Sequence, residues 1–243
     1  MKINKLIKSI FLTLAIFGLT STSARSTTLD SFRSRQQKAG ETLVANNYVR
    51  AYEWYETGND LYYSQDYLEA MRAYDRATEI NPDFDLAYAR KGWTFKKSGD
   101  SVKALNAFEQ AISINPDSAD HWDGKGNILY YMGRFEDSLT AYETSLAINP
   151  HASRSWSGKA WALTRLNDDR QSLVAFERAI ELKSDDFNYW YGKGSVLYKV
   201  GRYSEAVSVF EQALQLKPDD KYTLQYLELI EQRASERNLY SNY

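Results

Sequence analysis

The sequence predicts an all-α fold, a solenoid of five helix–turn–helix repeats of 34 residues each. Two observations carry this prediction. All four prolines share one phase, with spacings of 34, 34 and 68 residues, and four of the six tryptophans and ten of the 12 glycines also recur at multiples of 34. Self-similarity at such a period is the signature of stacked repeats. So few prolines also suit a mostly helical chain.

Residues 1–24 have the layout of a secretory signal peptide. Three lysines precede an apolar run from Ser9 to Leu19, and small polar residues lead to Ala24. This order predicts export, to a periplasm, an organelle lumen or the outside medium, with cleavage after Ala24. An uncleaved N-terminal anchor is the alternative. No later segment is apolar enough to span a bilayer, so we expect no transmembrane segment after signal removal.

Residues 25–50 form a leader ahead of the repeats. The stretch from Arg25 to Ser31 has the composition of a flexible segment. The stretch from Phe32 to Tyr48 has the pattern of a leading helix, which Gly40 weakens because glycine disfavours helix. We therefore expect a leader that is partly flexible or helical.

Each repeat contains two helical patterns. In the first repeat, Trp54 and Gly58 belong to one pattern, and Tyr74 and Ala77 to the next. A polar link joins them, and in three other repeats it holds a glycine that can end the first helix in the left-handed conformation. Gly58 predicts a close approach of the second helix at Ala70 and Ala77, with the rings of Trp54 and Tyr74 beside that contact. The repeats occupy residues 51–84, 85–118, 119–152, 153–186 and 187–220.

The fourth repeat departs most from the common pattern. Ala160, Asn167 and Ser184 stand where other repeats have glycine, glycine and proline. We therefore expect it to be folded but the least regular of the five.

Residues 221–243 read as a C-terminal capping helix and tail. Leu224, Leu227 and Ile230 share one side of a helix. A solenoid exposes an apolar face after its last repeat, so this helix is predicted to cover it.

One pattern recurs through the repeats and is complete in the fifth. It reads Trp190, Gly194, Leu197, Gly201, Tyr203, Ala206, Phe210, Ala213 and Pro218. The pattern resembles the tetratricopeptide repeat family, over 170 of the 243 residues. The resemblance implies a right-handed solenoid whose first helices line a concave groove that binds a peptide or a partner protein. Four lysines stand where the family more often has leucine, and we expect their stems to pack along the helices: Lys91, Lys125, Lys159 and Lys193.

The outward positions of the first helices are the candidate partner-binding residues. They are Tyr52, Tyr55, Asn59, Tyr62, Arg90, Trp93, Lys96, Asp123, Asn127, Tyr130, Trp161, Arg165, Tyr191 and Tyr198. Four tryptophans lie on the packing stripe and read as core: Trp54, Trp122, Trp156 and Trp190. Trp93 and Trp161 lie off that stripe, at a phase that holds asparagine or serine elsewhere. Both a binding role and packing between repeats fit this pair.

The composition gives little support to a catalytic, metal-binding or nucleic-acid-binding function. The chain has no cysteine, and its net charge of −2 gives no electrostatic reason to bind nucleic acid. Asp120, His121 and Asp123 are the one metal-like cluster, but adjacent helical residues point in different directions. We therefore predict no catalytic residue, no metal and no cofactor.

The predicted function is that of an exported scaffold or assembly factor for a protein or peptide partner. A clamp for a terminal carboxylate, known in some members of the family, is matched here at Asn59 alone. The alternative is a glycan-binding module of the cell envelope, with Tyr55, Trp93, Tyr130 and Trp161 as stacking platforms. Homo-oligomerisation stays open, as do the partner and the pathway.

Overall fold

The computed structural model describes residues 34, 37 and 46–240, with side chains up to residue 235. The predicted signal peptide and most of the predicted leader lie outside these residues. Within them there is no strand, and no helix is both long and apolar enough to cross a membrane.

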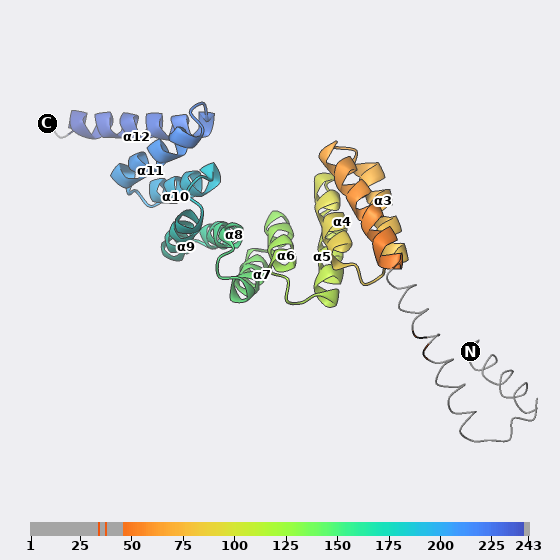
Figure 1. Ribbon diagram of the computed structural model, residues 1–243. Helices are drawn as coiled ribbons and strands as arrows, with labels where there is room; N and C mark the ends of the chain where they lie inside the picture. Colours follow the sequence, from red (N-terminus) through yellow and green to blue (C-terminus); the bar gives the residue numbers. More distant parts are fainter. Residues whose placement is uncertain (1–33, 35–36, 38–45, 241–243) are drawn as a thin grey trace, which may run out of the picture.

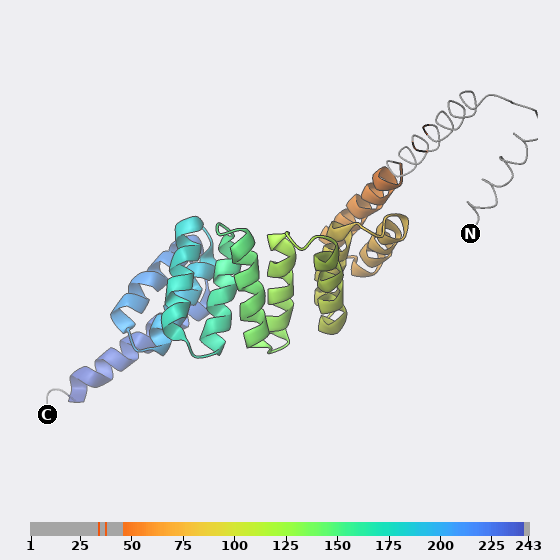
Figure 2. The ribbon, with the colours of Figure 1, turned by 90° about the horizontal axis from the view of Figure 1, so that it is seen from below.

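The described chain is a succession of paired helices. A helix over residues 46–63 comes first. The others are α3 Tyr67–Ile80, α4 Asp85–Lys97, α5 Ser101–Ile114, α6 Ala119–Tyr131, α7 Phe135–Ile148, α8 Ser153–Arg165, α9 Asp169–Leu182, α10 Phe187–Lys199, α11 Tyr203–Leu216 and α12 Lys221–Tyr240. Figure 1 shows the pairs stacked along a curved path. Figure 2 shows the same pairs side by side, from below. The predicted all-α solenoid is confirmed.

The turn inside each repeat uses one left-handed residue. Gly99, Gly133 and Gly201 have φ angles of +83°, +77° and +79°. Gln65 and Asn167 take the same conformation in the first and fourth repeats, with φ of +65° and +63°. The backbone therefore turns alike in all five repeats. The next residue precedes the second helix, and in three repeats its carboxylate accepts a hydrogen bond from a backbone N–H of the first turn: Asp66, Asp100 and Asp168.

The expected irregularity of the fourth repeat is wrong. Its helices α8 and α9 have 13 and 14 residues, the same lengths as α4 and α5. Ser172, at the alanine position, donates its hydroxyl to the carbonyl of Ala160 at 2.9 Å. Ser184 lacks the proline ring, but its carbonyl still accepts the indole N–H of Trp190 at 2.8 Å. Ser184 thus keeps the carbonyl contact that Pro116 and Pro150 make in other repeats.

One aromatic ring from each second helix occupies the centre of its repeat. The rings belong to Tyr74, Phe108, Tyr142, Phe176 and Phe210, all buried. A methyl group at Gly58 would lie 2.5 Å from Tyr74 Cε1, so this glycine makes room for the ring of its own repeat. The prediction that Gly58 serves contact with Ala70 and Ala77 is therefore corrected, because the ring is what fills the space.

The lysine series is structural and joins each repeat to the one before it. The ion pairs are Lys91–Asp75 at 2.7 Å, Lys125–Glu109 at 3.0 Å, Lys159–Glu143 at 2.9 Å and Lys193–Glu177 at 3.0 Å. The indole N–H groups of Trp122 and Trp156 donate to the carbonyls of Pro116 and Pro150, each at 2.9 Å, at the same junctions.

Two apolar residues predicted as packed are exposed. Trp54 is 41% exposed, because no repeat precedes it among the described residues to supply the junction that holds Trp122. Leu224 of α12 is also exposed. Leu227 and buried Ile230 pack on the last repeat as predicted, together with Tyr226, whose ring stacks on Phe210 at 5.0 Å.

Candidate functional site

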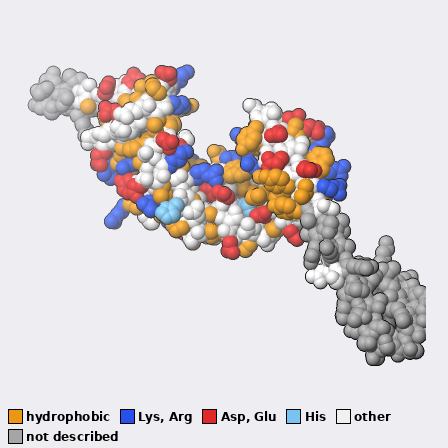
Figure 3. All heavy atoms as spheres, in the orientation of Figure 1, with side chains coloured by type: hydrophobic (Ala, Val, Ile, Leu, Met, Phe, Trp, Pro, Cys, Tyr) orange, Lys and Arg blue, Asp and Glu red, His pale blue; other side chains and the backbone are white. Residues whose placement is uncertain are grey.

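The concave face holds a cavity of about 580 Å³, called here the central cavity. It is lined mainly by α6, α8 and α10, the first helices of the last three repeats, with one residue each from α4 and α7. Figure 3 shows the hollow, where hydrophobic, acidic and basic side chains occur together. The cavity brings together six of the predicted site residues: Trp93, Asp123, Asn127, Tyr130, Trp161 and Tyr191.

Trp93 and Trp161 combine the two roles that the sequence left open. Trp93 packs edge-to-face on Phe108, with ring centroids 5.1 Å apart and an interplanar angle of 81°. Trp161 meets Phe176 in the same way, at 5.2 Å and 88°. Both indoles are half-buried and line the central cavity. Packing on the core ring therefore fixes each indole in place while part of it stays open to the concave face.

In the first four repeats, the residue at this phase is matched to the core ring of its repeat, whereas the fifth repeat has Ser195 with Phe210. Tryptophan accompanies the two phenylalanines just described, whereas asparagine accompanies tyrosine. The hydroxyl of Tyr74 donates to Asn59 Oδ1 at 3.0 Å, and Tyr142 is hydrogen-bonded to Asn127. Burial raises the pKa of Tyr142, which keeps its hydroxyl protonated. In these repeats asparagine thus provides a hydrogen-bond partner for the buried tyrosine hydroxyl. Tryptophan fills the space beside a phenylalanine ring, which has no hydroxyl.

Lys96 links Asn127 to two aromatic rings of the central cavity, Trp93 and Tyr131. Its Nζ donates to Asn127 Oδ1 at 2.6 Å and lies 4.0 Å above the ring centre of Tyr131. It also lies 5.4 Å from the ring centre of Trp93. Burial lowers the pKa of Lys96, and neighbouring Lys97 adds to that shift. The aromatic wall therefore already accommodates one cation of the protein itself.

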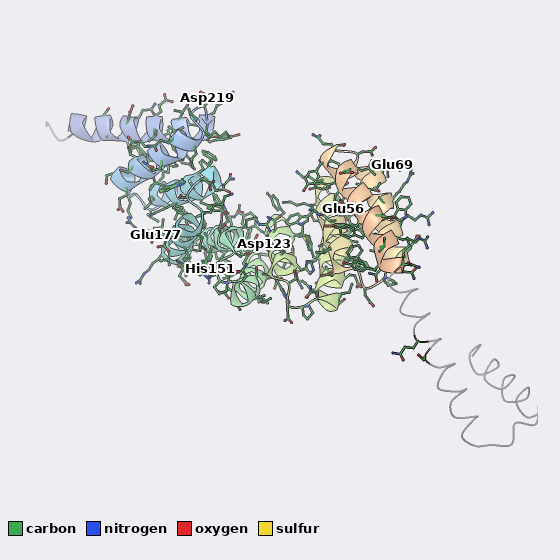
Figure 4. The ribbon with its side chains drawn as sticks, viewed as in Figure 1. Glu56, Glu69, Asp123, His151, Glu177 and Asp219 are labelled. Atoms are coloured by element: carbon green, nitrogen blue, oxygen red, sulfur yellow. The ribbon has the colours of Figure 1, made fainter. Side chains whose placement is uncertain are left out.

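Asp123 is the buried acid of the cavity. Figure 4 labels it between α6 and α8, and it is only 7% exposed. Ser155 Oγ donates to its Oδ1 at 2.8 Å, and Arg154 Nη2 lies 3.5 Å from its Oδ2. Burial raises the pKa of Asp123, although Arg154 and Ser155 act in the opposite direction. Arg154 is held by Asp120 at the shorter distance of 2.9 Å.

Eight further lining residues are absent from the candidate list: Tyr131, Tyr142, Arg154, Ser157, Gly158, Asp186, Asn188 and Tyr189. Tyr142 had a usable signal, because it is a tyrosine at a position that holds phenylalanine in three other repeats. Asp186 precedes α10 and its carboxylate accepts from the backbone N–H of Asn188 at 3.1 Å. Its place in the cavity depends on the curvature of the stack, for which the sequence offers no signal.

The predicted residues of the first repeat lie elsewhere. Tyr55 and Asn59 are each 8% exposed, so the prediction that they face outward is wrong. Tyr55 packs on Phe84, with ring centroids 5.2 Å apart, and Asn59 serves Tyr74. Phe84 is the cause, because it inserts at the start of α4 where the later repeats have smaller or polar residues.

Five other predicted site residues do not line the central cavity. Tyr52 is exposed, Tyr62 packs on Tyr67, and Arg90 lies over Tyr63. Arg165 lies 4.6 Å from the ring centre of Phe135, and Tyr198 packs on Tyr226 at 4.9 Å.

The metal-like cluster of α6 does not converge on one point. His121 is buried, and its Nε2 lies 2.9 Å from Asp85 Oδ2 in the preceding repeat. Asp123 faces the cavity and Asp120 pairs with Arg154. In the part of the chain that the structure describes, no three His, Asp or Glu side chains lie together as a metal site would require.

Solved structures of low sequence identity share the fold. PilF of Pseudomonas aeruginosa has a TM-score of 0.72, with 16% identity over 82% of this chain and 90% of that one. MamA of Desulfovibrio magneticus RS-1 has a TM-score of 0.62, with 16% identity over 71% of this chain and 97% of that one. YrrB, described as a tetratricopeptide protein with an unusual peptide-binding site, has a TM-score of 0.58, with 17% identity over 72% and 90%. At these identities the likeness shows the fold alone.

Sequence comparison supplies the family. Among curated proteins, none matches the chain. Models of the tetratricopeptide repeat match residues 51–84, 86–118, 124–173 and 187–220, which together exceed half of the chain. With paired helices stacked through glycine–ring contacts over the same residues, the chain belongs to the tetratricopeptide repeat family.

Proposed function

We propose that the protein is a binding scaffold that holds an extended segment of a partner protein in the central cavity. The observation that carries the proposal is the placement of Trp93 and Trp161 in one cavity, with Asn127 at the same phase between them. Rigid rings bury large areas with little loss of side-chain entropy, so such a surface favours binding. The role needs no chemistry, and the tetratricopeptide fold supports it, since YrrB of the same fold is described with a peptide-binding site.

The location of that partner follows from the N-terminus in this proposal. Residues 1–24 direct export and are removed after Ala24. The scaffold therefore acts on the far side of the membrane from the compartment where it is synthesised. There it assembles an envelope or membrane-associated complex. Sequencing the mature N-terminus tests export, and a soluble cytosolic protein that begins at Met1 contradicts it.

Glycan binding is not favoured. Of its four stacking platforms, Tyr55 is buried against Phe84 and offers no open face. The family and the related structures are those of tetratricopeptide proteins and give a carbohydrate ligand no support.

The experiment compares two tryptophans of one helix. Trp161→Leu keeps an apolar contact with Phe176 but removes the flat ring from the cavity. Trp156→Leu is the matched control, because Trp156 serves the junction with the preceding repeat through Pro150. Each variant is used to recover partners from the exported fraction of native cells. We expect Trp161→Leu alone to lose the partner, with unchanged circular dichroism. Equal recovery by both variants would contradict the groove assignment.

A further inference from the structure

We infer that Asp123 receives a cationic side chain of the bound segment, a lysine ammonium or an arginine guanidinium, within the ring-lined central cavity. This inference rests on the proposed function, since it names the chemistry of the segment that the cavity holds. It begins from the hydrogen bonds of one carboxylate.

The two oxygens of Asp123 differ in how well they are satisfied. Oδ1 accepts the hydroxyl of Ser155 at 2.8 Å. Among the residues that the structure describes, the polar partner of Oδ2 is Arg154 Nη2 at 3.5 Å, which is longer than a normal charge-assisted hydrogen bond. A buried carboxylate needs close donors to offset its lost hydration. Oδ2 therefore has the capacity to accept another donor.

Arg154 is a poor partner because it is held by another acid. Its Nη2 lies 2.9 Å from Asp120 Oδ1, and its side chain is 64% exposed. The lysine pairs at the repeat junctions give the comparison, for they span 2.7 to 3.0 Å to carboxylates that are half exposed. The more deeply buried acid thus has the longer contact, which is the reverse of what stability alone favours.

The walls of the cavity suit a cation. Trp93, Tyr130 and Trp161 present aromatic rings to the same space, and Asp186 adds a second carboxylate. Ring faces attract ammonium and guanidinium groups, and more strongly where water is excluded. The position of Lys96 over Tyr131 shows this contact inside the protein itself. Arg154 also lines the cavity, but its guanidinium is paired with Asp120, and an acidic segment would meet Asp123 and Asp186 with like charge.

The test uses purified mature protein, residues 25–243, on an array of immobilised decapeptides. Each peptide has alanine, leucine and tyrosine around one central residue, which is lysine, arginine, norleucine or glutamate. The proteins are wild type, Asp123→Asn, Arg154→Gln, Trp161→Leu and a control, Asp137→Asn. Asp137 is a suitable control because it is an exposed acid of α7 that pairs with Arg134.

The wild-type protein is expected to be retained about tenfold better on lysine and arginine peptides than on the norleucine and glutamate peptides, the size of one charge-assisted hydrogen bond. Asp123→Asn loses this preference and Asp137→Asn keeps it. Arg154→Gln strengthens it, because the competing guanidinium is gone. A merely structural role for Asp123 does not predict that gain.

Three results would overturn the inference, and they separate it from the proposed function. If the wild-type protein retains all peptides equally and Trp161→Leu loses that retention, the proposed scaffold function stands but the preference for a cationic side chain is ruled out. Loss of retention with Arg154→Gln, together with a glutamate preference, means that the ligand is anionic. No retention of any peptide by the wild-type protein counts against peptide binding in the cavity itself, and hence against both.

Discussion

Gly124 of α6 lies directly against the ring of Phe108, the core ring of the preceding repeat. A methyl group at Gly124 would be 2.1 Å from Phe108 Cε1, and a methyl group at Gly92 would be 2.6 Å from Cε2 on the other edge of the ring. The ring is therefore enclosed by one glycine from its own repeat and one from the next. Tyr142 repeats the arrangement between Gly126 and Gly158. Stacking of successive repeats depends on these close contacts.

Gly124→Ala is expected to lower the thermal midpoint of unfolding. Alanine favours helix over glycine by about 1 kcal/mol, but overpacking a core costs about 1–3 kcal/mol. Gly126→Ala is the matched control on the same helix, because its methyl group would meet Tyr142 at 3.0 Å and needs a smaller adjustment. Thermal scans of both variants by circular dichroism check this. A higher midpoint for Gly124→Ala would show that the ring can move.

The period of the sequence predicted these glycine positions but not their partners. Recurrence every 34 residues identifies equivalent positions, so the turn glycines and the all-helical solenoid followed from it. It does not say which side chain of another helix fills the space at Gly58: it favours Ala70 and Ala77, with the Tyr74 ring beside them, whereas the ring itself fills that space. That contact depends on how two helices cross, which periodicity along one chain does not encode.

The candidate site could be predicted in part for the same reason. Trp93, Asn127 and Trp161 share a phase, and the structure places all three in one cavity. Tyr55 shares a phase with Asp123, yet it is buried by Phe84, which lies at the start of α4 and not on the helix of Tyr55. Residues at this phase therefore line the cavity in the last three repeats, at Asp123, Ser157 and Tyr191, but not in the first.

Lys159→Met is expected to change stability little and binding not at all. Its ion pair with Glu143 spans 2.9 Å, but Glu143 is 53% exposed, and such pairs contribute less than about 1 kcal/mol. The methionine stem retains the packing along Trp156. Thermal midpoints and recovery of the partner check the two statements. Loss of the partner with an unchanged midpoint would make the lysine series a binding surface.

Asp85→Asn is expected to weaken the junction between the second and third repeats and to change its dependence on pH. Burial raises the pKa of Asp85, but hydrogen bonds from His121, Asn115 and the Leu86 N–H outweigh it, so the net pKa is lowered. A lowered pKa stabilises the folded state above the unfolded value of 3.8, and this stability is lost as the pH falls below it.

Measurement of the thermal midpoint between pH 3 and pH 7 tests this prediction. The variant should be destabilised near neutral pH by about 1–3 kcal/mol, because His121 and Asn115 lose a charged acceptor. It should also show a shallower decline in acid than the wild type. Parallel pH profiles for the two proteins would mean that Asp85 does not contribute through its charge.

Asp123→Asn is expected to have the opposite effect and to raise the thermal midpoint near neutral pH. Burial raises the pKa of Asp123, so the folded state holds its proton more tightly than the unfolded state does. Stability must then fall as the pH rises from the unfolded value of 3.8 to the higher folded value, and it stays lower above that range. The amide carries no charge and can still accept the hydroxyl of Ser155 through its oxygen.

The midpoint of Asp123→Asn should therefore exceed that of the wild type at pH 7, with the difference vanishing toward pH 3. Asp137→Asn, at an exposed acid, should show no such pH-dependent difference in midpoint from the wild type. A more stable variant that has lost its preference for cationic peptides would show that the carboxylate is kept for binding at the expense of stability. A midpoint below that of the wild type at pH 7 would instead make Asp123 a structural acid, adequately served by Arg154 and Ser155.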